Sequence, residues 1–153
     1  MPTVFSEDPY AAFNFIVTIN GILDDGLAVR CGFKECSGLS AETEVILYRN
    51  GSEKTAFRKI PGLQTYSNII LKRGWTGDIS LWNWRLDVIN GQVKRSDGSI
   101  VMLDANRQEV TRFNFIRGWP VRWEGPSFDS TKNEIAIETL EIAHEGLAID
   151  GQA

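Results

Sequence analysis

Apolar and polar residues alternate along much of the chain, which is the pattern of a half-buried β-strand. The first such stretch places Phe13, Phe15, Val17 and Ile19 on one side of an extended segment. This row predicts one core-facing strand face. By the same criterion we expect further strands near residues 28–34, 44–48, 68–72, 100–103, 110–115, 119–123 and 135–144.

The last of these stretches changes its alternation part of the way along. Ile135 and Ile137 have one parity, whereas Leu140 and Ile142 have the other. A strict two-residue period cannot bury all four side chains on one face. We therefore predict a bulge or twist near residues 138–139 that shifts the phase of the strand.

One segment has helical rather than strand periodicity, which predicts a single α-helix over about residues 78–90. Thr76 or Asp78 can cap its start, and Asn90-Gly91 supplies a left-handed stop. Such a wide apolar surface must pack against a sheet or a neighbouring subunit. Its apolar residues are Ile79, Leu81, Trp82, Trp84, Leu86, Val88 and Ile89.

Asn-Gly and Asp-Gly pairs predict tight turns, because both members of each pair tolerate a positive φ. A different interruption, RNGSEKTAFRKIPG at residues 49–62, is longer than a tight hairpin needs. Long excursions of this kind are usually functional or mobile. The predicted turns lie at Asn20-Gly21, Asp25-Gly26, Asn50-Gly51, Asn90-Gly91 and Asp97-Gly98.

A chain of 153 residues predicts a single domain with short arms at its two ends. No apolar run approaches the ~20 residues of a membrane span, and the start does not resemble a signal peptide. We therefore expect a soluble protein without a membrane anchor. The formal net charge of -4 argues against a dedicated nucleic-acid binder.

Catalytic and metal-binding motifs are missing from the sequence. His144 is the only histidine, and Cys31 and Cys36 do not have the spacing of zinc ligands. We expect His144 to be a packed or hydrogen-bonded structural residue and the cysteines to be reduced, although a bridge across a sharp turn stays open. Glu42 and Glu44 are more typical of a solvated face than of a catalytic pair. No catalytic residue, cofactor or metal is predicted.

Charge is distributed unevenly between two segments. Residues 49–59 contain Arg49, Lys54, Arg58 and Lys59 against the single acid Glu53, whereas residues 133–150 contain five acids and no Lys or Arg. Copies of such a chain can meet head to tail, and heterologous contacts generate rings or filaments. The alternative interpretation is two solvated surfaces of opposite sign.

A series of separated motifs in this chain resembles the tail tube protein family of contractile phage tails and contractile injection systems. The similarity extends from about residue 10 to residue 147. The motifs are Phe13-x-Phe15, CSGL at 36–39, ExEV at 42–45, YRNG at 48–51, KIPG at 59–62, NIILKRG at 68–74, TGD at 76–78, GWPV at 118–121, WEGPSF at 123–128 and NEIAIETLEIAHEGL at 133–147.

The resemblance implies a mainly β (α+β) fold, a small β-sandwich or open β-barrel with one helix and a long projecting hairpin. Such subunits complete a shared barrel in hexameric rings that stack into a hollow tube. Residues 49–60 would reach an adjacent ring, and residues 1–9 and those after 147 would be arms. The implied contact residues are Arg49, Asn50, Lys54, Phe57, Arg58, Lys59, Ile60, Glu134, Glu138 and Glu141.

The function expected from the resemblance is mechanical, with no enzymatic turnover. Expected partners are further copies of the chain, a contractile sheath, a baseplate or tube initiator, a cap or terminator, and luminal cargo that is protein or DNA. Assembly is expected in the bacterial cytoplasm, before incorporation into the particle or virion tail. Two alternatives stay open: a tube-initiating or secreted ring-forming relative, and a monomeric β-sandwich that binds a carbohydrate or peptide through its tryptophans.

Overall fold

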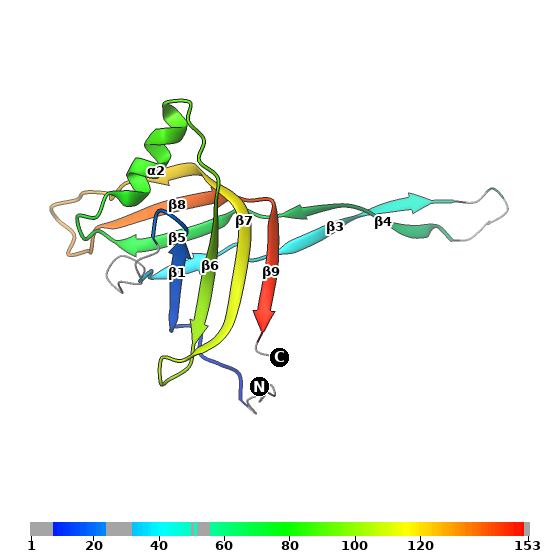
Figure 1. The fold of residues 1–153 in the computed structure, drawn as a ribbon, viewed down its shortest axis with the longest axis horizontal. Helices are drawn as coiled ribbons and strands as arrows, with labels where there is room; N and C mark the ends of the chain where they lie inside the picture. The colour runs from blue at the N-terminus through cyan, green and yellow to red at the C-terminus, as the bar shows by residue number, and fades with distance from the viewer. Residues whose placement is uncertain (1–7, 24–31, 50, 52–55, 152–153) are drawn as a thin grey trace.

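Strands dominate the structure, a computed structural model that describes residues 8–23, 32–49, 51 and 56–151 (Figure 1). A mainly β fold with a helix is thus confirmed. The elements are β1 (Phe15–Ile19), β2 (Glu35–Ser37), β3 (Ala41–Tyr48), β4 (Arg58–Tyr66), β5 (Ile69–Gly74), α2 (Ser80–Ile89), β6 (Ser96–Leu103), β7 (Glu109–Glu124), β8 (Ile137–Ala143) and β9 (Gly146–Gly151).

The long strand β7 belongs to two layers. Its first part pairs with β6 and β9, and its second part pairs with β8. The first layer has the order β1-β6-β7-β9, and the second has the order β7-β8-β5-β2. Sequence periodicity predicted two strands here, at 110–115 and 119–123. The chain instead continues through Arg117, whose φ is 52°, as one bent strand.

The core lies between the two layers and beneath α2. Val17 and Ile19 are fully buried, as their alternation predicts, whereas Phe13 precedes the strand and is 76% exposed. The buried apolar cluster is formed by Val17, Ile19, Leu23, Phe33, Ile69, Leu71, Leu81, Trp84, Ile100, Phe115, Leu140 and Ile142.

Gly98 makes room in this core for an aromatic ring. A Cβ atom on Gly98 would lie 2.3 Å from Cζ of Phe115. The turn predicted at Asp97-Gly98 is therefore wrong, because both residues lie within β6 and the glycine serves packing. Gly21 and Gly91 do have the positive φ expected of their turns. Predictions at residues 25–26 and at Asn50 lie outside the described residues.

Three segments differ in their strand content from what the sequence predicted. The strand expected at 28–34 falls largely on residues outside the described part, and the described strand β2 begins only at Glu35. No strand was predicted at residues 58–66, but the expected projecting hairpin is present, and β4 begins at Arg58 and continues to Tyr66 as one of its two strands. The C-terminal arm expected after residue 147 is instead part of β9, which pairs with β7.

Strand β8 keeps a strict alternation, so the bulge predicted near residues 138–139 is wrong. Glu138, Leu140 and Ile142 all face inwards, and Ile137 faces outwards. The prediction assumed that every apolar residue is buried. Glu138 takes an inward position because Arg73 lies directly opposite it on β5, and the two side chains form a buried ion pair.

The helix α2 lies where its pattern predicted. Leu81 and Trp84 are its buried residues, and Gly91 follows its end with a φ of +84°. Ile79 occupies the capping position, while the carboxylate of the preceding Asp78 accepts a hydrogen bond from the backbone N–H of Ser80 at 3.1 Å. Helix and sheet therefore share one core.

Candidate interaction surfaces

A two-stranded ribbon made of β3 and β4 projects from one side of the body (Figure 1). We call this ribbon with its connecting residues, 41–66, the hairpin. Every residue of β3 is exposed. Isolated two-stranded hairpins are marginally stable, and large exposed apolar patches usually mark interaction sites. The exposed apolar side chains are Val45, Ile46, Leu47, Tyr48, Phe57, Ile60 and Leu63.

The root of the hairpin is fixed by backbone contacts. Gly38 approaches Asn68 so closely that a Cβ on Gly38 would lie 2.0 Å from the Asn68 carbonyl oxygen. The hydroxyl of Ser67 donates to the carbonyl of Gly38 at 2.9 Å. His144 places Nε2 3.0 Å from the carbonyl of Ser67 and Nδ1 3.0 Å from that of Gly146. His144 is therefore a hydrogen-bonded structural residue, as expected.

Residues predicted as contacts on the hairpin are exposed wherever the structure describes them. Arg49, Phe57, Arg58, Lys59 and Ile60 are all on the surface. Asn50 and Lys54 lie outside the described residues. Basic and apolar side chains thus occur together on this part of the chain.

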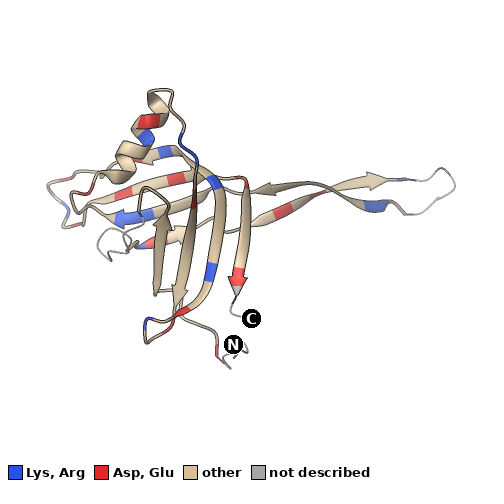
Figure 2. Cartoon of the chain, in the orientation of Figure 1, with Lys and Arg blue, Asp and Glu red and all other residues tan. Residues whose placement is uncertain are grey.

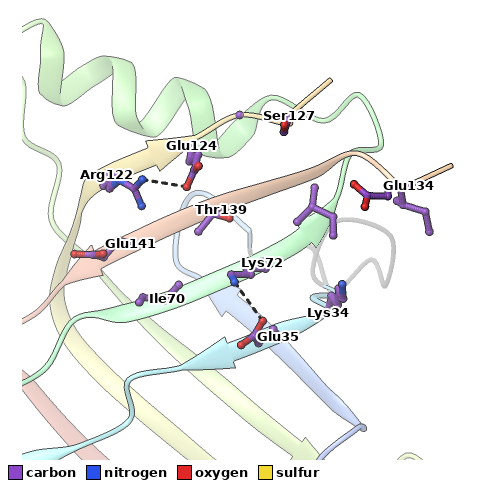
Figure 3. A pocket seen from close by; sticks show the side chains of 13 residues that line it. Lys34, Glu35, Ile70, Lys72, Arg122, Glu124, Ser127, Glu134, Thr139 and Glu141 are labelled. Carbon is purple, nitrogen blue, oxygen red and sulfur yellow. Dashed lines mark ion pairs between the residues drawn. The ribbon is translucent and has the colours of Figure 1, made fainter. Parts of the chain in front are cut away.

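A hollow of about 500 Å³ lies on the outer face of the second layer (Figure 3). Ile70, Ile135 and Ile137 give it apolar lining. Two ion pairs cross its wall, Lys72 to Glu35 at 3.6 Å and Arg122 to Glu124 at 3.1 Å. The remaining lining residues are Lys34, Gly125, Ser127, Glu134, Thr139 and Glu141.

The three acidic residues predicted as contacts are separated by the fold. Glu134 is exposed and Glu141 is half-buried, and both line the hollow. Glu141 also accepts a hydrogen bond from Nδ2 of Asn68 at 2.8 Å. Glu138 points to the opposite side of β8, where its side chain is 1% exposed. Its predicted role as a surface contact does not agree with this position.

Glu138 belongs instead to a buried network that sequence reasoning missed. Its carboxylate pairs with Arg73 and accepts a hydrogen bond from Nε1 of Trp123 at 3.0 Å. Arg73 also donates to the backbone carbonyl of Asp78 at 3.0 Å, just before α2. The network therefore joins β5, β7 and β8 to the start of the helix. Among the described residues, no buried side-chain nitrogen or oxygen lacks a hydrogen-bond partner.

The first layer ends in β1 on one side and β9 on the other. Within the described residues, the ladder partner of β1 is β6 and that of β9 is β7, apart from one bridge between Ile19 and Leu23. The barrel is thus not closed by a single copy. Few residues along the strands of the first layer are charged (Figure 2); Arg112 pairs with Glu109 at 2.6 Å and lies opposite Asp150.

Features associated with catalysis are scarce in the described part of the chain. No cluster there of three or more His, Cys, Asp or Glu residues has the geometry to hold a metal ion. Cys36 has a free thiol, and burial, together with the nearby Glu35 charge, raises its pKa to about 11. None of the helices described is long and apolar enough to cross a membrane.

The tryptophans contribute mainly to packing. Trp84 is buried and donates its indole N–H to the carbonyl of Lys94 at 2.9 Å. The ring centroids of Trp82 and Trp123 are 5.0 Å apart, and Trp75 lies 6.4 Å from Trp123. Trp82 and Trp123 are partly buried and Trp75 is 39% exposed, so these three rings form a packed but partly accessible cluster.

Comparisons with known proteins identify a family. Residues 11–148 match the family described as T4-like virus tail tube protein gp19. No curated protein matches the chain.

Solved structures of contractile injection systems contain similar chains. One comes from the sheath-tube complex of an extracellular contractile injection system, PVC, in its extended state, with 25% identity over 95% of this chain and 93% of that chain and a TM-score of 0.82. A chain of the anti-feeding prophage (AFP) tube terminating cap is 25% identical over 98% of this chain and 96% of that chain, with a TM-score of 0.83. A chain of the six-fold symmetrised AFP baseplate is 23% identical over 95% of this chain and 98% of that chain, with a TM-score of 0.81. This last similarity shows a shared fold.

Proposed function

Because this chain belongs to the family of the T4-like virus tail tube protein gp19, we propose that it is the repeating subunit of an inner tail tube. Copies form hexameric rings, and the rings stack into a hollow conduit. The six-fold symmetry of the similar AFP baseplate supports the proposed ring size. The role is structural, without catalytic turnover.

The observation that carries this proposal is the unfinished first layer. Its four strands alternate in direction, because each pairs antiparallel with the next. Strand β9 of one copy and β1 of the next therefore run antiparallel when placed side by side. Repeating that joint closes a barrel and removes exposed strand edges, which otherwise promote aggregation.

The hairpin supplies contacts between rings in this assembly. Residues 49–60 contain four basic residues against one acid. They include Arg58 and Lys59, which are exposed beside the apolar Phe57. We assign the opposing acidic surface to Glu134, which is exposed, and Glu141, which is half-buried, and leave out Glu138 because it is buried. Heterologous contacts of this kind extend an assembly in one direction.

Partners follow from the proposed place in the particle. A sheath surrounds the tube, a baseplate or tube initiator begins it, and a cap or terminator ends it. The similar chains from the PVC sheath-tube complex and from the AFP baseplate and cap support these assignments. Protein or DNA cargo occupies the channel. Assembly takes place in the bacterial cytoplasm, and the tube then leaves as part of the particle.

Electron microscopy of the purified protein tests the function. Tubes identify a main tube subunit, single rings identify a tube initiator or secreted relative, and monomers at high concentration, even with the companion proteins added, refute the proposal. The double variant Arg58→Glu/Lys59→Glu should stay folded but give shorter or fewer tubes. Lys94→Glu/Arg95→Glu, an adjacent pair after α2, is the matched control for the change in charge. Equal tube lengths for both variants would contradict the role of the hairpin.

A further inference from the structure

The hollow on the second layer combines an apolar floor with an acidic rim. Ile70 and Ile137 are partly buried in it, and Ile135 is 81% exposed at its border. Its volume of about 500 Å³ falls within the ~300–1,000 Å³ typical of pockets that bind drug-sized ligands. Such a surface has room for a large side chain and its neighbours.

We propose that this hollow receives the hairpin of a second copy of the chain. Phe57 packs on the isoleucine floor, while Arg58 and Lys59 face the acidic rim. The inference rests on the proposed function, because it names the surface that the hairpin binds in the tube. Aromatic side chains, phenylalanine among them, and arginine are enriched at the cores of protein–protein interfaces.

Charge complementarity supports this pairing. Four acids, Glu35, Glu124, Glu134 and Glu141, line the hollow against the three bases Lys34, Lys72 and Arg122. The pairs Lys72–Glu35 and Arg122–Glu124 neutralise four of these groups within the same copy. Glu134, Glu141 and Lys34 remain, with a net charge of -1. Residues 49–60 of the hairpin carry a net charge of +3, from four bases and one acid.

The placement of the two surfaces fits a head-to-tail contact. The hairpin projects from one side of the molecule, and the β7–β8 connection, which borders the hollow, lies on the other side (Figure 1). Strand β4 has 9 residues, so at ~3.3 Å per residue it extends about 30 Å. Four strands spaced ~4.8 Å apart measure about 14 Å across. The hairpin is therefore long enough to pass the near edge of a neighbour and reach its second layer.

Cysteine trapping tests the contact directly. In a background with Cys31→Ala and Cys36→Ala, Phe57→Cys is combined with Ile135→Cys or, separately, with Ser127→Cys. Assembled material is oxidised and run on a non-reducing gel. We expect a ladder of covalent multimers from both pairs. The control combines Phe57→Cys with Ala105→Cys, an exposed position on the β6–β7 turn. On the gel it should run as a single chain without covalent cross-links.

A charge reversal provides a second measurement that does not depend on cysteines. Glu134→Lys should shorten the tubes, and adding Lys59→Glu should restore part of the lost length. Tubes that form without cross-links, cross-links equal to the control, or an absence of rescue would overturn the assignment of the hollow but not the tube function. An unmodified protein that never assembles would overturn both. Protection of the cysteine at position 135 only after a sheath protein is added would show that the sheath occupies the hollow instead.

Discussion

The variant Glu138→Ala removes the carboxylate that pairs with buried Arg73. Both side chains are 1% exposed, so water cannot replace the lost partner. Breaking one side of a buried ion pair typically costs ~3–5 kcal/mol, because the remaining charge stays buried without its partner. The indole N–H of Trp123 loses its acceptor as well. Asp78 still faces Arg73 through its carboxylate, 3.4 Å from Nη1, and through its backbone carbonyl, which favours the lower end of that range.

This loss is large compared with the ~5–15 kcal/mol of stability typical of a domain. For a chain of this length, ~2–4 °C of Tm is lost per kcal/mol, which predicts a fall of roughly 6–20 °C. Thermal unfolding followed by circular dichroism at a fixed, low protein concentration measures it. Concentration must be held constant because self-association raises the apparent stability.

Two further variants make the result specific to the buried pair. Glu141→Ala lies on the same strand but on the outer face, so it should lower Tm by only a small amount. The double variant Arg73→Met/Glu138→Leu removes both buried charges and should recover part of the lost stability, because the indole N–H of Trp123 still lacks its acceptor. Equal melting temperatures for Glu138→Ala and Glu141→Ala would refute the inward orientation of Glu138 and the network built on it.

Three other substitutions or reactions have defined outcomes. Gly98→Ala should cost ~1–3 kcal/mol of stability in thermal melts, because its Cβ would lie 2.3 Å from Phe115, and Phe115→Leu should relieve part of that cost. Gly38→Ala, at a φ of +89° and 2.0 Å from the Asn68 carbonyl, should displace the hairpin root and speed limited proteolysis of the hairpin; unchanged cleavage would contradict this. A pKa of about 11, raised from 9.0, leaves Cys36 about 100-fold less thiolate at pH 8, so Cys36 in the folded protein should alkylate slowly, and faster as pH rises towards 11, as read from its tryptic peptide after the reaction is quenched. Equal rates in native and denatured protein would contradict that environment.

Local periodicity predicts those elements whose apolar residues all face the core. Strand β1 buries Val17 and Ile19 on one face, and its alternation is visible in the sequence. The helix was equally predictable, because the spacing of its apolar residues and the stop signal at Asn90-Gly91 indicate the same segment. Strand β4 was not, because Pro61-Gly62 and neighbouring charges are typical of a loop. These residues are tolerated in an exposed ribbon, where β3 and β4 pair and a bulge lies between Thr43 and Val45.

Long-range pairing decides the features that the sequence alone could not predict. Glu138 faces inwards because Arg73, 65 positions away, lies opposite it, and no local pattern encodes that register. The hollow likewise depends on four strands and two connections that meet only in the fold. The sequence resemblance predicted the barrel and the hairpin, but it did not separate Glu134 and Glu141 from Glu138.

The hairpin projects from one side of the body only, and this asymmetry has a consequence for growth. In the proposed tube, a finite stack exposes uncovered hairpins at one extremity and vacant hollows at the other. The extremities are chemically different, so elongation has a polarity, and the proteins that start and finish the polymer need unlike shapes. A subunit within the stack cannot leave without withdrawing its ribbon from a neighbour, which makes exchange from the middle slow compared with loss from an end.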